Sequence, residues 1–239
     1  MKTRRLASWV GAATALYGAP AALGIPGLTH RISPGGRSPG RPGGVIALTF
    51  DDGPHRDGTP AVLDVLAEYR CTATFFIIGE QLARRPDLVR RIHEGGHELA
   101  VHGWTHRCTL LSPPAEIHRD IGRTVALIAD LTGQSPTRYR PPYGVASTPA
   151  LLAARHARLA PAWWTAWGRD WEPNATAAGV SQLVTRQLPR ARRPVVLLHD
   201  SDTYGTTGSW RTTAGATRRL CRAWQEQGAK AVSLDEVCP

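Results

Sequence analysis

The sequence predicts an α/β protein in which parallel strands alternate with helices, because three observations agree. Apolar runs without polar alternation, such as residues 45–50 and 195–198, are typical of strands that are covered on both faces. Stretches with helical spacing of apolar residues, such as 113–131, separate these runs. Repeated strand–helix units make the strands parallel, and right-handed connections curl such a sheet toward a barrel.

From residue 44 onward the predicted elements follow one another closely. Each strand is an apolar or β-branched run, each helix repeats apolar residues at helical spacing, and Gly or Pro separates them. The predicted strands are 45–50, 74–78, 98–101, a short one near Arg138, 161–165, 195–198 and 230–232. The predicted helices are 59–69, 86–93, 113–131, 149–156, 178–188 and 213–227.

The composition suits one domain of this class. A chain of 239 residues with 42% hydrophobic residues and eight Trp can bury a substantial core. The net charge is +10, but residues 1–44 contain six basic residues and no acidic one, so much of the charge belongs to an N-terminal arm. The other arginines are spread along predicted helices, which is typical of solvated faces, and we predict no nucleic-acid partner.

Residues 1–29 have the composition of an export segment. A basic head, Met1 to Arg5, precedes an uncharged stretch rich in Ala and Leu, with Ala19-Pro20-Ala21 as a cleavage candidate. We predict a signal peptide or a membrane anchor here, with a disordered tail as the third alternative, because the stretch is long enough to span a bilayer but contains Gly and Pro. Residues 30–43 are a predicted Gly/Pro/Arg-rich linker. The expected location is exported, either secreted or anchored at the outer face of the cell membrane.

Polar side chains follow several predicted strands, at the end where active sites of such folds lie. Asp51 and Asp52 come directly after the first strand, and two adjacent carboxylates favour a bound cation or a proton-transfer role. By itself, Asp-Asp-Gly-Pro fits an ordinary acidic turn equally well. His102 and His106 follow the third strand with a spacing that lets both rings share one metal ion.

Two later segments also bring polar residues to strand ends. Arg140 precedes two prolines that stiffen its loop, and the apolar strand 195–198 ends at His199 and Asp200. Each of these segments alone fits an ordinary loop, so their meaning depends on the whole set.

Taken together, the segments resemble the polysaccharide deacetylase family, the NodB-like enzymes of carbohydrate esterase family 4. The resemblance rests on the following segments, which occur in the family's order and spacing: Thr49–Pro54, Ala73–Phe76 with Gly79, His102 with His106, Arg140–Gly144, Arg169–Trp171 and Leu197–Asp200. It implies that residues 44–239 form a distorted, incomplete (β/α) barrel. It also implies a hydrolase that removes N-acetyl groups from acetylated amino-sugar polymers of the peptidoglycan or chitin type.

The resemblance implies a metal site and a base. Asp52, His102 and His106 would bind one divalent metal ion, for which zinc is the first choice and cobalt or another divalent ion is the alternative. Water bound to that ion would attack the acetyl carbonyl. Asp51 would take the proton of the water, held in place by Arg140.

The remaining roles that the resemblance implies concern the leaving group and the pocket. His199 would protonate the departing amine, oriented by Asp170. The backbone N–H of Tyr143 would stabilise the oxyanion, and Trp171 and Leu197 would line the acetyl pocket.

The chain departs from the family pattern at two positions. Gly103 replaces the Ser or Thr that usually follows the first histidine, so we expect the loop to lack one hydrogen bond. Trp167 stands where an acid is common, three residues before Asp170. Four rings are candidates for stacking on sugars or for packing in the core: Trp104, Trp163, Trp164 and Trp167.

Three questions stay open at this point. An O-acetyl esterase acting on a xylan-like polysaccharide and a non-catalytic glycan-binding protein are the alternatives to an N-deacetylase. Four cysteines, none in a Cys-x-x-Cys pair, allow three disulfide connectivities, of which we favour Cys221 with Cys238 in an oxidising compartment. The sequence gives no oligomeric state.

Overall fold

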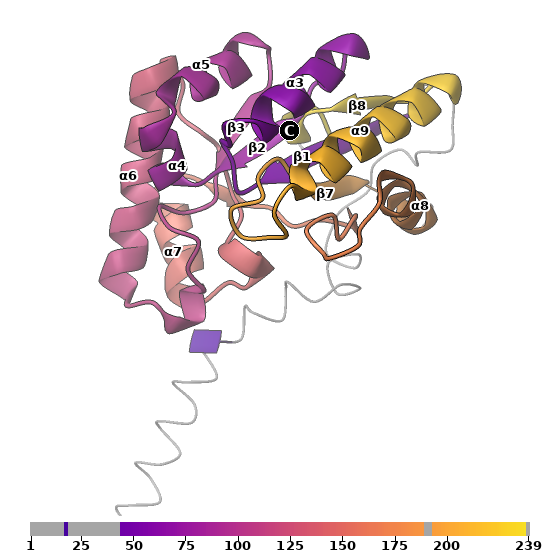
Figure 1. Cartoon of the computed structure of the whole chain (residues 1–239). Helices are drawn as coiled ribbons and strands as arrows, with labels where there is room; N and C mark the ends of the chain where they lie inside the picture. The colour runs from indigo at the N-terminus through magenta and orange to yellow at the C-terminus, as the bar shows by residue number, and fades with distance from the viewer. Residues whose placement is uncertain (1–16, 19–43, 189–192, 238–239) are drawn as a thin grey trace, which may run out of the picture.

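The computed structural model describes residues 17–18, 44–188 and 193–237 (Figure 1). Most of the predicted export segment and linker therefore lies outside the described residues, as does Cys238. In the part that is described, no helix has both the length and the hydropathy needed to cross a membrane.

One curved sheet of parallel strands forms the centre of the molecule, which confirms the predicted incomplete (β/α) barrel. Its strands are β1 Val45–Asp51, β2 Thr74–Ile77, β3 Glu98–Val101, β4 Arg138–Tyr139, β5 Ala160–Pro161, β6 Ala166–Trp167, β7 Val195–His199 and β8 Lys230–Val232. The order across the sheet is β5-β4-β3-β2-β1-β7-β6, and β8 pairs with the first half of β1. Strand β1 therefore pairs with three strands, with β2 and β7 at its carboxyl end and with β8 at its amino end.

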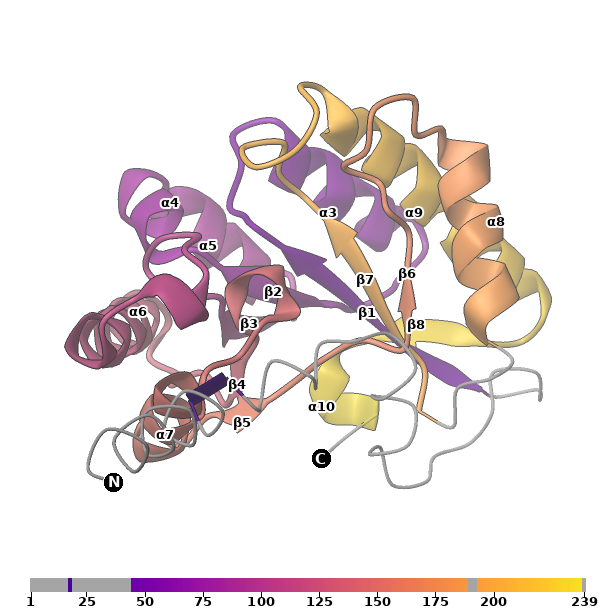
Figure 2. The ribbon, with the colours of Figure 1, turned by 90° about the horizontal axis from the view of Figure 1, so that it is seen from below.

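Helices cover the outer face of the curved sheet. They are α3 Gly58–Glu68, α4 Gly79–Arg84, α5 Pro86–Glu94, α6 Pro114–Thr132, α7 Thr148–His156, α8 Ala177–Gln187 and α9 Ser209–Glu226. Figure 2 shows them as an arc around the strands from α7 to α8, with the short α10, Leu234–Val237, on the other side. Two 3₁₀ turns, Thr109–Leu111 and Pro142–Gly144, complete the described elements.

The alternation of side chains along each strand divides the core into two layers. On β1, Ile46, Leu48 and Phe50 are buried against the outer helices, whereas Ala47 belongs to a smaller cluster inside the curve of the sheet. The next positions on that inner side are Thr49 and Asp51. Strand β7 follows the same rule, since Leu197 lies in the inner cluster and His199 comes two residues later.

The predicted strand 161–165 is wrong. Ala160–Pro161 is β5 at one edge of the sheet and Ala166–Trp167 is β6 at the other, so the residues between them cross the interior. Ala162 still donates its N–H to the Tyr139 carbonyl at 2.8 Å at the end of β5, and Ala162 and Trp164 pack in the inner cluster. The short helix α4 was not predicted, and α9 begins at Ser209, four residues before the predicted start.

Candidate active site

The carboxyl ends of the central strands surround a cavity of about 200 Å³. Eight of the ten predicted site residues line it: Asp51, Asp52, His102, His106, Tyr143, Trp171, Leu197 and His199. The other two, Arg140 and Asp170, are fully buried behind it. Strand register explains part of this convergence, because Asp51 lies directly opposite His199 across the β1–β7 pair.

Three side chains converge as a candidate metal site. Asp52 Oδ1 lies 3.4 Å from His102 Nε2 and 3.3 Å from His106 Nε2. One donor atom from each residue lies within 4.8 Å of the other two, and no other group of three such residues occurs among the residues described. The His102 ring is oriented by its Nδ1, which is 2.8 Å from the Arg140 carbonyl and donates to it.

The backbone of Asp52 directs its carboxylate toward the two histidines. Asp52 has a φ of 76°, a left-handed conformation that Asp tolerates better than most residues and that ends the strand alternation after Asp51. Its Oδ1 is buried and has no hydrogen-bond partner among the described residues. Such an oxygen beside two imidazole nitrogens suits a divalent cation, so the donor set fits the expected ion.

Charge at this cluster favours deprotonated ligands. Burial would raise the pKa of Asp52, but contact with His102 and the positive charges of His199 and His106 lower it to about 2. Burial lowers the pKa of His106 to about 4, although Asp52 opposes this shift. At neutral pH, Asp52 is therefore ionised and His106 is neutral, as metal coordination requires.

Asp51 belongs to a different set of contacts. Arg140 Nη1 donates to Asp51 Oδ1 at 2.6 Å and to Thr49 Oγ1 at 2.9 Å, and Arg140 Nε donates to the Ala162 carbonyl at 3.1 Å. The guanidinium also lies 3.9 Å from the centroid of the Phe76 ring. These contacts fix Arg140, which is 0% exposed, and keep Asp51 paired with a cation.

A second buried carboxylate holds His199. Asp170 accepts hydrogen bonds from the His199 backbone N–H at 2.7 Å and from the Thr213 hydroxyl at 2.6 Å, and its Oδ1 lies 3.0 Å from His199 Nδ1. Burial would lower the pKa of His199, but the charge of Asp170 and its hydrogen bond raise it to about 9. The ring is therefore protonated at neutral pH.

Aromatic rings form one wall of the cavity. Trp164 and Trp167 stack with their centroids 6.0 Å apart, and Trp167 lies 5.5 Å from Trp171. Trp171 in turn meets the His199 ring edge-on at 4.8 Å. The other two candidate rings do not line the cavity, because Trp104 packs under the Arg123 guanidinium and Trp163 donates to the Gly144 carbonyl.

The loop between the two histidines shows the effect of Gly103. Gly103 has a φ of 103°, a backbone conformation that residues other than Gly rarely adopt. In the described part of the chain, the buried Nδ1 of His106 has no hydrogen-bond partner. Two tyrosine rings instead contact the imidazole, Tyr204 stacked at 4.3 Å and Tyr143 tilted at 4.3 Å. Gly103 has no side chain that could orient this ring by a hydrogen bond, and the two tyrosine rings pack against it instead.

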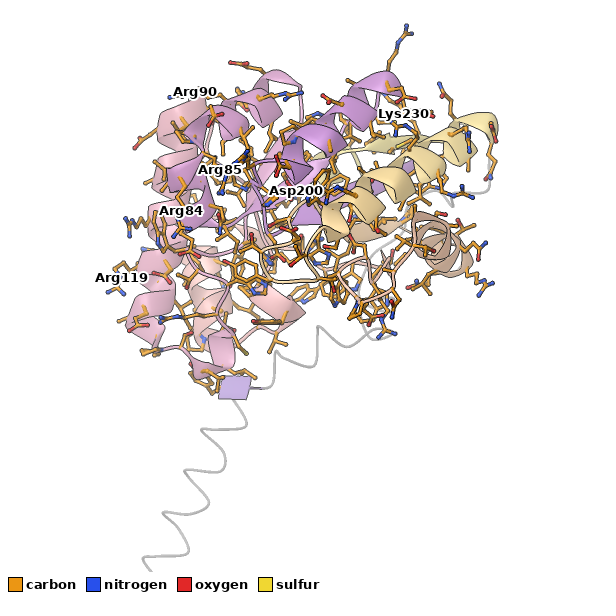
Figure 3. The ribbon with its side chains drawn as sticks, in the orientation of Figure 1. Arg84, Arg85, Arg90, Arg119, Asp200 and Lys230 are labelled. Carbon is orange, nitrogen blue, oxygen red and sulfur yellow. The ribbon has the colours of Figure 1, made fainter. Side chains whose placement is uncertain are left out.

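Asp200 lies beneath the turn that carries the two adjacent carboxylates. It accepts a short hydrogen bond from the Thr59 hydroxyl, and a Cβ on Gly53 would come within 2.4 Å of Asp200 Oδ2, so the turn requires Gly. Burial raises the pKa of Asp200 to about 7. Figure 3 shows Asp200 in the middle of the molecule, whereas Arg84, Arg90 and Arg119 lie on the outer helices.

Sequence reasoning missed three residues that support the site. Thr49 shares the inward face of β1 with Asp51, so strand alternation could have identified it. Thr213 lies on α9 and Tyr204 in the loop before it, and no local pattern connects either of them with the earlier strands.

This fold and site define a class, the incomplete (β/α) barrel enzymes, here with a candidate Asp/His/His metal site at the carboxyl end of the sheet. A family model described as polysaccharide deacetylase matches residues 39–162. The chain belongs to the polysaccharide deacetylase family and is a hydrolase of that family. Members of the family are metal-dependent, and Asp52, His102 and His106 are the candidate ligands here.

Individual relatives agree with this assignment. The chain is 40% identical over 158 residues to a chitooligosaccharide deacetylase from Bradyrhizobium sp. (strain ANU 289), which covers 65% of this chain and 70% of that protein. It is 32% identical over 192 residues to a peptidoglycan-N-acetylglucosamine deacetylase from Listeria monocytogenes, covering 80% of this chain and 38% of that protein. A family 4 acetyl xylan esterase from Clostridium thermocellum, solved with a cobalt ion, has a TM-score of 0.71 and 28% identity, and the match covers 81% of this chain and 89% of that one.

Proposed function

We propose that the chain removes N-acetyl groups from acetylated amino-sugar polymers of the peptidoglycan or chitin type. The observation that carries this proposal is the convergence of three groups in one cavity: the Asp/His/His cluster, the Asp51–Arg140 pair and the His199–Asp170 pair. The two sequence relatives, which are deacetylases of chitooligosaccharide and peptidoglycan, support the substrate class.

Asp52, His102 and His106 would hold the divalent ion. Two imidazoles and one carboxylate suit zinc, and a related esterase contains cobalt, so we assign Zn²⁺ first and Co²⁺ second. When bound, the ion supplies Lewis acidity, which lowers the pKa of water and polarises a carbonyl oxygen. Its positive charge would also relieve the repulsion between Asp51 and Asp52.

Asp51 acts as the general base in this proposal. Its Oδ1 is engaged by Arg140, while its Oδ2 lies on the side of His102 at 3.8 Å from Nε2 and is available to accept a proton from the attacking water. The buried Arg140 pairs its positive charge with Asp51 and holds the carboxylate in place. The backbone N–H of Tyr143, at the mouth of the cavity, is our candidate donor to the oxyanion.

His199 acts as the general acid. A pKa of about 9 keeps its ring protonated at neutral pH, and Asp170 fixes Nδ1 so that Nε2 is left to donate to the departing amine. Leu197 and Trp171 offer an apolar surface for the acetyl methyl group, and Trp164 and Trp167 extend that surface for a sugar ring. The nitrogen of an amide must be protonated before the C–N bond breaks, so a protonated histidine in the cavity suits amide cleavage.

O-acetyl ester cleavage on a xylan-like polysaccharide is the second candidate, because an acetyl xylan esterase shares the fold at 28% identity. Acetate release from acetylated chito-oligosaccharides, peptidoglycan and acetylated xylan separates the two, with chelation and metal re-addition as controls. We expect chelator-sensitive release from the amino-sugar polymers. Release from xylan alone would replace the first candidate by the second, and binding without release would contradict enzymatic function.

We further propose that residues 1–29 export the chain, as a signal peptide or as an anchor at the outer face of the cell membrane. Their basic head and long uncharged stretch support this, and the proposed polymers lie outside the cytoplasm. Fractionation of cells that express the full chain is the test. Activity confined to the cytosol would contradict the proposal.

A further inference from the structure

Two buried thiols lie together in the outer core layer, away from the active site. Cys71 precedes β2 and is 7% exposed, and Cys221 lies on α9 and is 2% exposed. Both belong to the same core cluster, and their side chains are close enough to form a hydrogen bond with one another. Neither thiol takes part in the proposed reaction, so their pairing needs a separate explanation.

The two thiols differ in their position relative to a surface cleft. Cys71 lines a surface cleft of about 520 Å³ between α3 and α5, together with Leu63, Leu66, Arg70 and Arg91, and Cys221 is not among its lining residues. The cleft carries Asp64 and Glu94 as well as its two arginines, so its charge selects for neither sign. It gives a small molecule access to Cys71 while Cys221 stays behind it.

The two thiols also differ in acidity. The hydrogen bond from Cys221, the backbone N–H of Ala231 and the charge of Lys230 lower the pKa of Cys71 to about 7, against the effect of burial. The same hydrogen bond and burial raise the pKa of Cys221. Figure 3 places Lys230 on β8 beside α9. Cys71 is therefore the thiol that supplies a thiolate, the reactive form, near neutral pH.

We propose that Cys71 and Cys221 are an oxidisable pair that a small-molecule disulfide converts into an intramolecular disulfide, with Cys71 attacking first. The Cys71 thiolate bonds to one sulfur of the oxidant, RSSR, and its S–S bond breaks to release RS⁻. Cys221 then attacks the Cys71 sulfur of the mixed disulfide and gives up its proton, so that a second thiol leaves. In total, two cysteines and RSSR yield one protein disulfide and two RSH.

The link would join the start of β2 to α9 across the core layer. Cys71 is held by its backbone N–H, which donates to the Leu66 carbonyl at 2.9 Å, and α9 carries the Thr213 hydroxyl that bonds Asp170. Because the closed loop is long, roughly 150 residues, we expect oxidation to raise the melting temperature by about 5–10 °C. The disulfide would thus stabilise the helix that supports the proposed general acid.

This pairing differs from the Cys221–Cys238 pairing that the sequence favoured. Cys238 lies outside the described residues, whereas Cys71 and Cys221 are neighbours within them. The two pairings share Cys221 and exclude one another, so one experiment decides between them.

The test is disulfide mapping of the full chain after incubation with oxidised glutathione, with free thiols blocked by N-ethylmaleimide before digestion. We expect one cross-linked peptide that joins Cys71 to Cys221. Cys221→Ser should stop at a glutathione adduct on Cys71, and Cys108→Ser, the matched control, should form the same cross-link as the wild type. A Cys221–Cys238 link, or Cys71 and Cys221 both recovered as free thiols, would overturn the proposal.

A second measurement is independent of oxidation. In the reduced native chain, we expect Cys71 to react with iodoacetamide at least about tenfold faster than Cys221, because it is the accessible and more acidic thiol. Equal rates, or faster reaction at Cys221, would contradict the assigned order of attack.

Discussion

The two ends of the sheet bury similar side chains, which makes their comparison informative. At the amino ends of β3 and β4, a cavity of about 470 Å³ is lined by His97, Glu98 and Asp235. At the carboxyl ends, the smaller cavity contains His106 with Asp52 and Asp51. Burial lowers the pKa of both His97 and His106 to about 4, so a perturbed histidine occurs at each end.

The partners of these side chains differ between the two ends. Glu98 accepts a hydrogen bond from the Thr74 hydroxyl at 2.6 Å, and Arg138 donates to Asp235 at 2.7 Å. His97 packs edge-on against Phe75 with ring centroids 5.5 Å apart. At the carboxyl end, by contrast, three candidate ligand atoms lie within 4.8 Å of one another. Convergence of donors, more than burial or pKa, distinguishes a candidate site from a packed polar cluster.

The largest expected effect is on the converging donors. Asp52→Ala removes the carboxylate that contacts both histidines, and we expect bound metal and acetate release to fall to background together. Metal analysis of the purified variant and an acetate assay measure both. Retention of one equivalent of metal would contradict the assigned ligand set.

The next largest effect should separate proton transfer from metal binding. His199→Ala leaves all three ligands in place, so we expect metal content to be unchanged and kcat to fall by about 10²–10⁴-fold. A loss of metal in this variant would place His199 in the metal site instead. The His97→Gln variant described below serves as the matched histidine control.

A smaller change should appear in the pH profile of Asp170→Asn. Asp170 raises the pKa of His199 to about 9, so the wild type should lose activity as the pH rises through that value and the acid is deprotonated. Without this charge, the alkaline limb should move toward the ordinary histidine pKa of about 6.5. An alkaline limb that stays near pH 9 would show that another group sets it.

The smallest effect is expected at the amino end of the sheet. His97→Gln changes a buried ring whose pKa is as low as that of His106 but which belongs to no candidate metal cluster in the described part of the chain, so metal content and kcat should stay within about twofold of the wild type. We expect only a modest loss of thermal stability from the contact with Phe75. A loss of metal from this variant would break the comparison between the two ends.

Much of the fold was accessible from the sequence because strand and helix periods are local. The central strands were predicted nearly to the residue, for example Glu98–Val101 as β3. Residues 162–165 were misassigned because their course depends on which sheet edges β5 and β6 occupy. That information is not local.

In the candidate site, too, the features that depend on local sequence were predicted and those that depend on tertiary structure were not. The residues inferred from the ordered motifs do converge, since the motifs mark the ends of neighbouring strands. Thr213 and Tyr204 were not predicted because helix α9 and the loop before it reach the site through tertiary packing, which no local pattern of the sequence encodes. The left-handed backbone of Asp52 gives the two adjacent carboxylates different neighbours. The local sequence likewise does not predict this conformation.

The central claim is that Asp51 and Asp52 have separate tasks, one as a base paired with Arg140 and the other as a metal ligand. The most direct test is the metal content and turnover of Asp51→Asn, with circular dichroism to establish that it folds. We predict one equivalent of bound metal and a kcat lowered by about 10²–10⁴-fold. Asp51→Asn protein that is fully active, or that has lost its metal, would contradict the claim.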